Sequence, residues 1–429
     1  MNEIGLMNEV RIKKQDNAIN SQNFTSVIVA ITIFLSIDPF FVWTSFAGGI
    51  FASALKVLQL LSIALMIFQL KEVSLSTFFG GLSILGIFLF YCFFTGRVSG
   101  TTHPLLIGNV LIYLFYALNV MTDRNILIKS FDLLRTFFAV VLGYTLIIYT
   151  LILLGVPVPY SILQSGEAGR VEAGFQFYHN YYGCIVINQS GSLLYRFTSV
   201  FTEPGVVGTF CAFFLAAGDL KIRKSKKDVI FLISGILSFS IAFYLMIVFF
   251  YVLKSLRNGG IKPFLALLVV AIVYSVFINV EFSNPELQML QERLTITEEG
   301  LAGDNRMKKM AENAYQAFLK SDLKTVLFGY GYPNSRSAAA AWQASASYKE
   351  SVYCLGVLGY GLMLVWFIFT PCLCFKSKNP KENRAMYSYI VIFIVSQYQR
   401  PYMKSLFLVY ILLAGCLYIQ QKVKTADKT

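Results

Sequence analysis

Long apolar runs recur along the chain, and they limit the folds available to it more than any other feature. A helix of about 20 apolar residues crosses the hydrocarbon core of a bilayer. Because lipid offers no hydrogen-bond partners, a crossing segment must satisfy its own backbone, as a helix does. The sequence therefore predicts an all-α polytopic membrane protein. The runs that we assign to membrane helices lie at residues 26–46, 50–70, 75–95, 104–121, 131–155, 204–220, 263–281, 351–374, 386–399 and 404–421.

The composition agrees with this assignment. Hydrophobic residues make up 56% of the 429 residues and charged residues only 14%, against about 25% charged residues in a typical soluble protein. Residues 1–23 are polar, and the first apolar run continues past the length of a signal sequence, so we expect no cleavable signal peptide. We interpret residues 1–429 as one integral membrane domain.

Basic residues gather in the connections between apolar runs and predict the orientation of the chain. The net charge is +13, and basic clusters lie at residues 11–14, 71, 124–129 and 221–228. Lys and Arg are enriched in the cytoplasmic loops of membrane proteins. This rule explains the positive charge without nucleic acid, which we do not expect as a partner. It also predicts a cytoplasmic N-terminus.

The apolar run 229–253 has basic residues on both sides, with Lys227 before it and Lys254 and Arg257 after it. If both flanks are cytoplasmic, the run crosses an even number of times or enters the membrane and returns. Its midpoint, residues 234–240, reads SGILSFS and offers Gly and Ser for a turn. We predict two short helices here, about twelve membrane helices in total, and both termini in the cytoplasm.

Two long segments then fall on the external side of the membrane, residues 156–203 and residues 282–350. The second contains DNRMKKMAENAYQAFLKSD at 304–322, whose apolar residues recur near helical spacing. This pattern predicts an amphipathic helix on the membrane surface. The following FGYGYPNS, at 328–335, contains two glycines and a proline and predicts a turn.

The stretch RFTSVFTEPG, residues 196–205, places Arg196 and Glu203 at the external start of an apolar run. Arg306 precedes the predicted surface helix, and Arg400 interrupts SQYQRPYMK at the outer end of another span. The three arginines come from separate segments that the predicted topology brings to one membrane face. The planar guanidinium suits phosphate recognition, so we predict a diphosphate-binding site formed by Arg196, Arg306 and Arg400, with Glu203 as a catalytic carboxylate.

Each of these residues also has a structural interpretation. Glu203 can begin a helix, where carboxylates are favoured, and Arg196 can form an ion pair there. Arg306 can be a solvated surface charge, and Arg400 can extend its side chain to the lipid headgroups. Asp38, in the first span, lies near enough to the outer interface for a structural role.

Other sequence motifs point to no cofactor. We find no nucleotide-binding fingerprint and no HExxH or cysteine–histidine metal cluster, so we predict no metal and no cofactor. The seven cysteines lie mostly within apolar runs, and we expect no disulfide framework. His179, Tyr330 and Arg97 are secondary candidates for the site.

The pattern R-F-x-S-x-F-x-E-P-G at residues 196–205, followed by the start of a membrane helix, resembles Wzy-type O-antigen and capsular polysaccharide polymerases. Three further segments add to the resemblance: GDNRMKKMAENAYQAFL, LFGYGYPNS and SQYQRPY. It implies a GT-C-like, metal-independent glycosyltransferase of the bacterial cytoplasmic (inner) membrane. The implied partners are undecaprenyl-diphosphate-linked glycans, as donor and acceptor, and a protein that regulates chain length.

Two alternatives stay open. The related O-antigen ligases transfer finished polymer to lipid A core and carry an essential histidine in the second external loop, whereas residues 282–350 contain none. A flippase or other secondary transporter would show internal repeats and binding groups near the bilayer midplane. We see no repeat between the halves of this chain, and its charged candidates fall in external segments.

Overall fold

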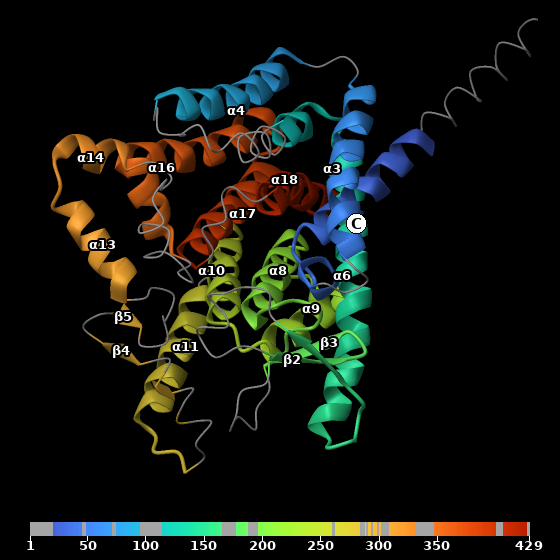
Figure 1. The fold of residues 1–429 in the computed structure, drawn as a ribbon, viewed down its shortest axis with the longest axis vertical. Helices are drawn as coiled ribbons and strands as arrows, with labels where there is room; N and C mark the ends of the chain where they lie inside the picture. The colour runs from blue at the N-terminus through green and yellow to red at the C-terminus, as the bar shows by residue number, and fades with distance from the viewer. Residues whose placement is uncertain are drawn as a thin grey trace, which may run out of the picture.

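Helices make up most of the described residues of the structure, which is a computed structural model (Figure 1). It describes residues 20–44, 49–70, 74–94, 114–164, 177–187, 196–259, 262–283, 309–330, 347–399 and 406–426, with a few more between 284 and 301. The chain begins with helix Asn20–Leu35, α2 (Phe40–Trp43), α3 (Ile50–Phe68), α4 (Leu75–Phe94), helical residues 114–121 and α6 (Arg124–Leu153). It continues with β1 (Ser161–Gln164), β2 (Phe177–Tyr181), β3 (Cys184–Ile187), α8 (Pro204–Ala217), α9 (Lys226–Leu237), α10 (Ile241–Arg257) and α11 (Lys262–Asn279). Its last elements are β4 (Ile296–Thr297), β5 (Gly300–Leu301), α13 (Lys309–Leu319), α14 (Leu323–Phe328), α16 (Tyr348–Cys374), α17 (Pro380–Gln399) and α18 (Leu406–Ala426).

Four of the described helices are long and apolar enough to cross a membrane, and they indicate a helical membrane protein. They are α3, α6, α16 and residues Phe407–Ala426 of α18. The predicted span 204–220 corresponds to α8, which has only 14 residues. Helix Asn20–Leu35 is also shorter than a full crossing.

The first predicted span, 26–46, is interrupted. Its helix ends at Leu35, and Asp38 has a left-handed backbone with φ 56°. Pro39 then forms a β-bridge with Phe201. The prediction of one continuous helix is wrong here, because a proline has no N–H for the helix ladder and disfavours helical geometry in the residue before it.

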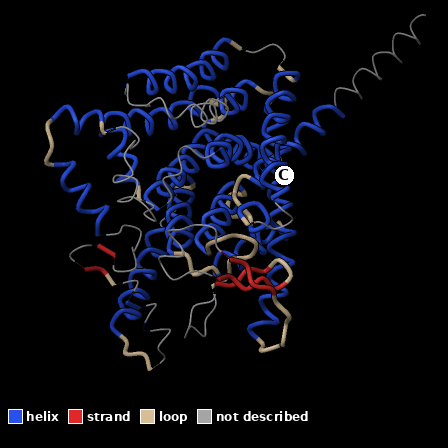
Figure 2. Tube along the Cα trace, in the orientation of Figure 1, coloured by secondary structure: helices blue, strands red, loops and turns tan. Residues whose placement is uncertain are grey.

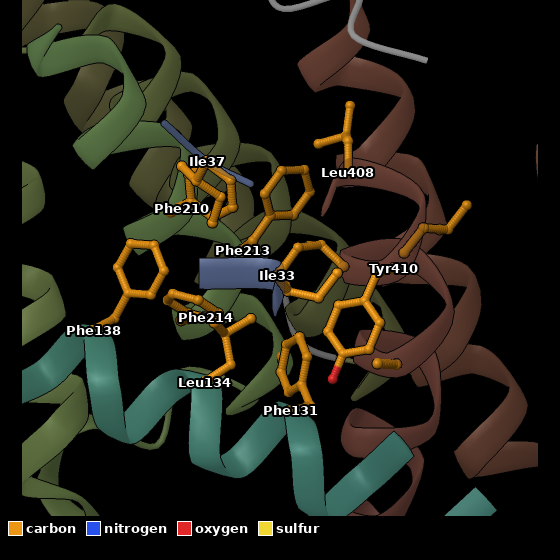
Figure 3. Close-up of a cluster of buried hydrophobic side chains, with 14 of the residues drawn as sticks. Ile33, Ile37, Phe131, Leu134, Phe138, Phe210, Phe213, Phe214, Leu408 and Tyr410 are labelled. Carbon is orange, nitrogen blue, oxygen red and sulfur yellow. The ribbon is translucent and has the colours of Figure 1, made fainter. Parts of the chain in front are cut away.

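Helix α8 is the most deeply buried element. Every one of its residues except Val206 is buried, and it lies between α6 and α10 near the centre of the molecule (Figure 1). The Phe138 ring of α6 stacks on Phe210 at a centroid distance of 5.4 Å and meets Phe214 edge-on at 4.9 Å (Figure 3). An apolar helix that is hydrophobic on all sides is typical of such a central position.

The run 229–253 forms two helices that turn back on each other, as predicted. The turn at Ser238–Ser240 lies against Gly208 in the first half of α8: a Cβ on Gly208 would overlap Ser240. The outer ends of α9 and α10 both lie near the other end of α8. There Asp228 is close to Gly218, and Arg257 binds Asp219. The chain therefore enters and leaves this hairpin at the same end of α8.

The segment 156–203 adds a small sheet to the helical fold, so the fold is mostly α rather than all-α. Strands β1, β2 and β3 pair antiparallel in that order (Figure 2). Tyr182 and Gly183, between β2 and β3, have φ values of 50° and 95°, as a two-residue hairpin turn requires. The Tyr144 hydroxyl of α6 donates to the Tyr182 carbonyl at 3.0 Å and fixes the sheet beside that helix.

The segment 282–350 contains the predicted amphipathic helix, which the structure describes over Lys309–Leu319 as α13. Ala311 and Phe318 are buried, and α13 and α14 pack on α16 at the edge of the molecule (Figure 1). Gly329 ends α14 with φ 74°, where a left-handed backbone favours glycine. The predicted turn therefore begins at Gly329, whereas Gly331 and Pro333 lie outside the described residues.

The basic connections that the sequence separates come together at one end of the helices. The Arg124 guanidinium donates to the Cys374 carbonyl at 2.7 Å, and Gln420 donates to the Phe375 carbonyl at 2.9 Å. Lys227 lies 3.2 Å from Asp132. These bonds join the start of α6, the start of α9 and the ends of α16 and α18. We call this region, which includes residues 218–228, 254–257, 375–384 and 418–426, the basic end.

Candidate functional site

The stretch 196–205 lies at the opposite end of α8 from the basic end. Its residues pack on the far half of α6: Thr145 and Ser199 share a hydrogen bond of 2.7 Å, and the rings of Tyr149 and Phe197 are 5.2 Å apart. We call residues 38–40, 196–204 and 238–240 the α8 mouth. Apolar residues separate it from the basic end along the whole of α8.

Arg196 is half-buried and holds the turn of the α9–α10 hairpin. Its Nε donates to the Ser238 carbonyl at 3.1 Å, and its terminal Nη2 donates to the Phe239 carbonyl at 3.0 Å. Carbonyls at a helix C-terminus carry partial negative charge and lack intrahelical partners, so a guanidinium stabilises them. Arg196 therefore has a structural role, and the same bonds fix its guanidinium at the α8 mouth.

Glu203 is the N-cap residue of α8 and is half-exposed. Its backbone is extended, with φ −142° and ψ 141°, and Pro204 occupies the first helical position. The side chain accepts no hydrogen bond from the first turn, unlike an N-cap Ser or Asp. Glu203 thus begins the helix through its backbone, at a helix N-terminus where a carboxylate is favoured.

The structure brings a further carboxylate, that of Asp38, to this end, and the sequence analysis did not include it in the site. The Pro39–Phe201 bridge is antiparallel, and the Phe40 N–H donates to the Val200 carbonyl at 2.8 Å. This register places Asp38 opposite Thr202, one residue before Glu203. Asp38 is exposed. Only the pairing of two segments distant in sequence could have revealed this proximity.

His179, a secondary candidate, lies on β2 of the small sheet. Its ring stacks on Tyr160 with centroids 4.1 Å apart, and its Nδ1 lies 3.5 Å from the Tyr181 hydroxyl. Partial burial lowers the pKa of His179 below its ordinary value. These contacts account for the histidine as part of an aromatic cluster.

Tyr330, the second of these candidates, belongs to a different region. Its ring packs on Tyr353 and Phe318 at 4.9 Å and 5.8 Å, and its N–H donates to the Tyr353 carbonyl. This cluster joins α13 and α14 to α16, apart from α8 (Figure 1). The structure does not bring Tyr330 to the α8 mouth.

Arg306, Arg400 and Arg97 lie outside the described residues. The predicted convergence of three arginines on one diphosphate therefore stays a prediction. Of its members, the structure locates Arg196 alone.

A second charged region, which the sequence analysis did not single out, lies at the basic end. Arg135, 2% exposed, binds Asp228 and the Tyr418 hydroxyl, and its guanidinium lies 4.9 Å from the Tyr418 ring centroid. Asp219 binds Arg257 and lies 3.6 Å from Lys254. The signal available in the sequence was an arginine, Arg135, within a long apolar run.

Within the described part of the chain, no group of three or more His, Cys, Asp or Glu side chains is arranged to hold a metal ion. The cysteines described there are free. What the α8 mouth offers chemically is a fixed guanidinium and two carboxylates, those of Glu203 and Asp38, at the end of a buried helix.

A scan against models of known protein families finds no match, and a search of the curated proteins finds no relative of this chain.

Proposed function

We propose that the protein is a membrane glycosyltransferase that polymerises undecaprenyl-diphosphate-linked oligosaccharide repeat units into O-antigen or capsular polysaccharide. The observation that carries the proposal is the α8 mouth, where Arg196 is fixed by two carbonyls and Glu203 begins a buried helix. The resemblance of residues 196–205 to Wzy-type polymerases supports the same activity.

The reaction requires stabilisation of a leaving group rather than an external energy source. An acceptor hydroxyl oxygen attacks the anomeric carbon of the lipid-linked glycan, and the bond from that carbon to the diphosphate oxygen breaks. The electron pair leaves with the diphosphate. A preorganised cation is an efficient way to stabilise such developing charge, and the backbone bonds of Arg196 provide preorganisation.

The proton of the acceptor hydroxyl needs a base, and in this proposal Glu203 receives it. Its carboxylate is not used for capping the first turn of α8. Asp38, on the segment that pairs with Phe201, helps to orient the acceptor. Arg306 and Arg400 complete the diphosphate site in the proposal.

The proposed setting is the bacterial cytoplasmic membrane, with about twelve membrane helices and both termini in the cytoplasm. The basic end then faces the cytoplasm and the α8 mouth faces the external side. The substrates are lipid-linked glycan donor and acceptor, and a chain-length regulator is the expected protein partner.

The decisive experiment measures chain growth by purified variants with lipid-linked repeat units. We expect Arg196→Lys to be nearly as damaging as Arg196→Ala, since a point charge cannot replace a two-pronged donor, with a rate loss of about 10²–10³. Glu203→Gln should abolish growth if the carboxylate is the base. Because Arg196 also holds the hairpin turn, rates are compared at equal folded fraction. Arg223→Ala, an exposed change at the basic end, serves as the matched control.

Gene deletion separates the alternatives. Loss of a polymerase leaves lipid A core with a single repeat, or no polymer in a capsule system. Loss of a ligase leaves bare core while polymer accumulates on its carrier, and loss of a flippase traps lipid-linked single repeats on the cytoplasmic side of the membrane. Long polymer that remains on undecaprenyl diphosphate would therefore contradict the proposed activity, as would normal chain growth by folded Arg196→Ala protein.

A further inference from the structure

A cavity of about 480 Å³ opens at the basic end between α6, α8, α9 and α18. It is distinct from the α8 mouth, since it lies by Gly218 at the other end of α8. The charged side chains that line it are Asp132, Arg135, Lys221, Lys227, Asp228 and Lys422. Four cations therefore face two carboxylates.

The two carboxylates are already neutralised by specific partners. Asp228 binds Arg135. Asp132 lies 3.2 Å from Lys227 and accepts a hydrogen bond of 2.8 Å from the Tyr418 hydroxyl. Neither carboxylate is left to balance the other cations.

Two lysines supply the excess charge. None of the described carboxylates forms an ion pair with Lys422, whose ammonium lies 4.9 Å from the Tyr418 ring centroid. Lys221 lies 3.8 Å from Asp219, but Asp219 already binds Arg257 and lies 3.6 Å from Lys254. The cavity therefore has a net positive charge.

Arg135 lies in the wall of this cavity and, within the described part of the chain, lacks one hydrogen-bond partner. Its side chain is 3% exposed, and its Nε is buried without a hydrogen-bond partner among the described residues. A buried donor without a partner and an uncompensated cation both cost free energy. An anion bound by Lys221 and Lys422 would relieve the cost of their uncompensated charge.

We infer that this cavity binds a phosphate-bearing anion, with the headgroup of an anionic glycerophospholipid as its first candidate. Basic pockets between membrane helices at the cytoplasmic side commonly bind such headgroups. Lys221 and Lys422 contact the phosphate oxygens, while Arg135 stays paired with Asp228 in the cavity wall. Free inorganic phosphate shares this chemistry. The site is independent of the proposed polymerase activity.

The test uses the full-length protein in neutral detergent. Binding of phosphatidylglycerol is measured by native mass spectrometry against phosphatidylcholine, and binding of inorganic phosphate by thermal shift against chloride at equal ionic strength. The variants are Lys422→Gln and Lys221→Gln. The matched control is Lys424→Gln, an exposed lysine two residues further along α18 that does not line the cavity.

Phosphatidylglycerol should bind more tightly than phosphatidylcholine. Lys422→Gln and Lys221→Gln should each weaken binding by roughly tenfold, as expected for loss of a charged hydrogen bond, while Lys424→Gln leaves it unchanged. If phosphate alone binds with the same dependence on Lys422 and Lys221, the site stands and its ligand is a free anion. Equal effects of Lys422→Gln and Lys424→Gln, or preference for neither anion, would overturn the inference.

Discussion

At the basic end, Asp228 and Asp219 each bind an arginine, whereas at the α8 mouth Arg196 donates to two backbone carbonyls. A buried carboxylate joins two helices through an ion pair with an arginine, whereas two carbonyls at the end of α9 orient a guanidinium and are stabilised by it. The same residue type thus pairs helices at one end and holds a helix turn at the other. Four experiments test the difference between the two ends, and they are given in order of decreasing expected effect.

The first experiment tests on which side of the membrane each end of α8 lies. It gives the largest effect, because a fused reporter is active on one side of the membrane and inactive on the other. Reporters fused near Ser225, Asn258 and Asn379 should all lie in the cytoplasm, since the hairpin α9–α10 begins and ends at the basic end. Reporters near Gln164 and Ser335 should lie outside, although Ser335 is beyond the described residues. A reporter at Asn379 on the side opposite to Ser225 would invert this topology.

The second experiment changes the buried ion pair of Arg135 and Asp228 at the basic end and measures thermal unfolding. Both side chains of Arg135 and Asp228 are 3% exposed, and removing one partner of a buried pair typically costs about 3–5 kcal/mol. Asp228→Asn should therefore lower the thermal unfolding midpoint strongly. The double variant Arg135→Met/Asp228→Leu should recover much of the loss, because no charge stays buried.

Lys227→Gln is the control for this pair, since it joins the same helices. Lys227 and Asp132 have side chains 32% and 47% exposed, and exposed pairs are worth about 1 kcal/mol or less. A loss as large as that of Asp228→Asn would mean that exposure does not govern these pairs.

At the α8 mouth, the close contact of the hairpin turn with α8 can be loosened. A methyl on Gly208 would overlap Ser240 and lie 2.9 Å from the Ser238 hydroxyl, so Gly208→Ala should cost roughly 1–3 kcal/mol. It should also reduce chain growth, because the carbonyls that orient Arg196 move. Gly361→Ala, with nothing within 4 Å of the added methyl, should leave both unfolding and activity near wild type.

The smallest expected effect is on the pH dependence of unfolding, and it comes from His179 in the sheet beside the α8 mouth. The pKa of His179 is lowered by partial burial, so the unfolded chain binds a proton more readily than the folded chain. Its contribution to stability is present above the ordinary pKa of about 6.5 and is lost as pH falls toward the folded value. His179→Phe keeps the stack on Tyr160 and should reduce the fall in unfolding midpoint between pH 8 and pH 5.5. An unchanged pH profile would show that another group causes it.

Much of the secondary structure follows from local pattern. The hairpin could be predicted because charge on both flanks and a Gly/Ser midpoint are properties of one segment. The helix Lys309–Leu319 could be predicted because its apolar spacing repeats locally. The break in the first helix at Asp38–Pro39 could also have been predicted, since a proline in an apolar run is a local signal that a helix ends.

The residues alone predict a chain that is mostly helical, apolar enough for a membrane, and basic in alternate connections. Which apolar helix is central depends on packing between distant segments and appears only in the folded structure. Helix α8 is almost wholly buried, while α3 exposes Ile50, Val57 and Phe68. Lipid and protein interior are equally apolar solvents, so hydropathy does not distinguish them. The positions of Asp38 beside the α8 mouth and of Asp228 beside Arg135 were also decided there, because they depend on contacts between segments distant in sequence.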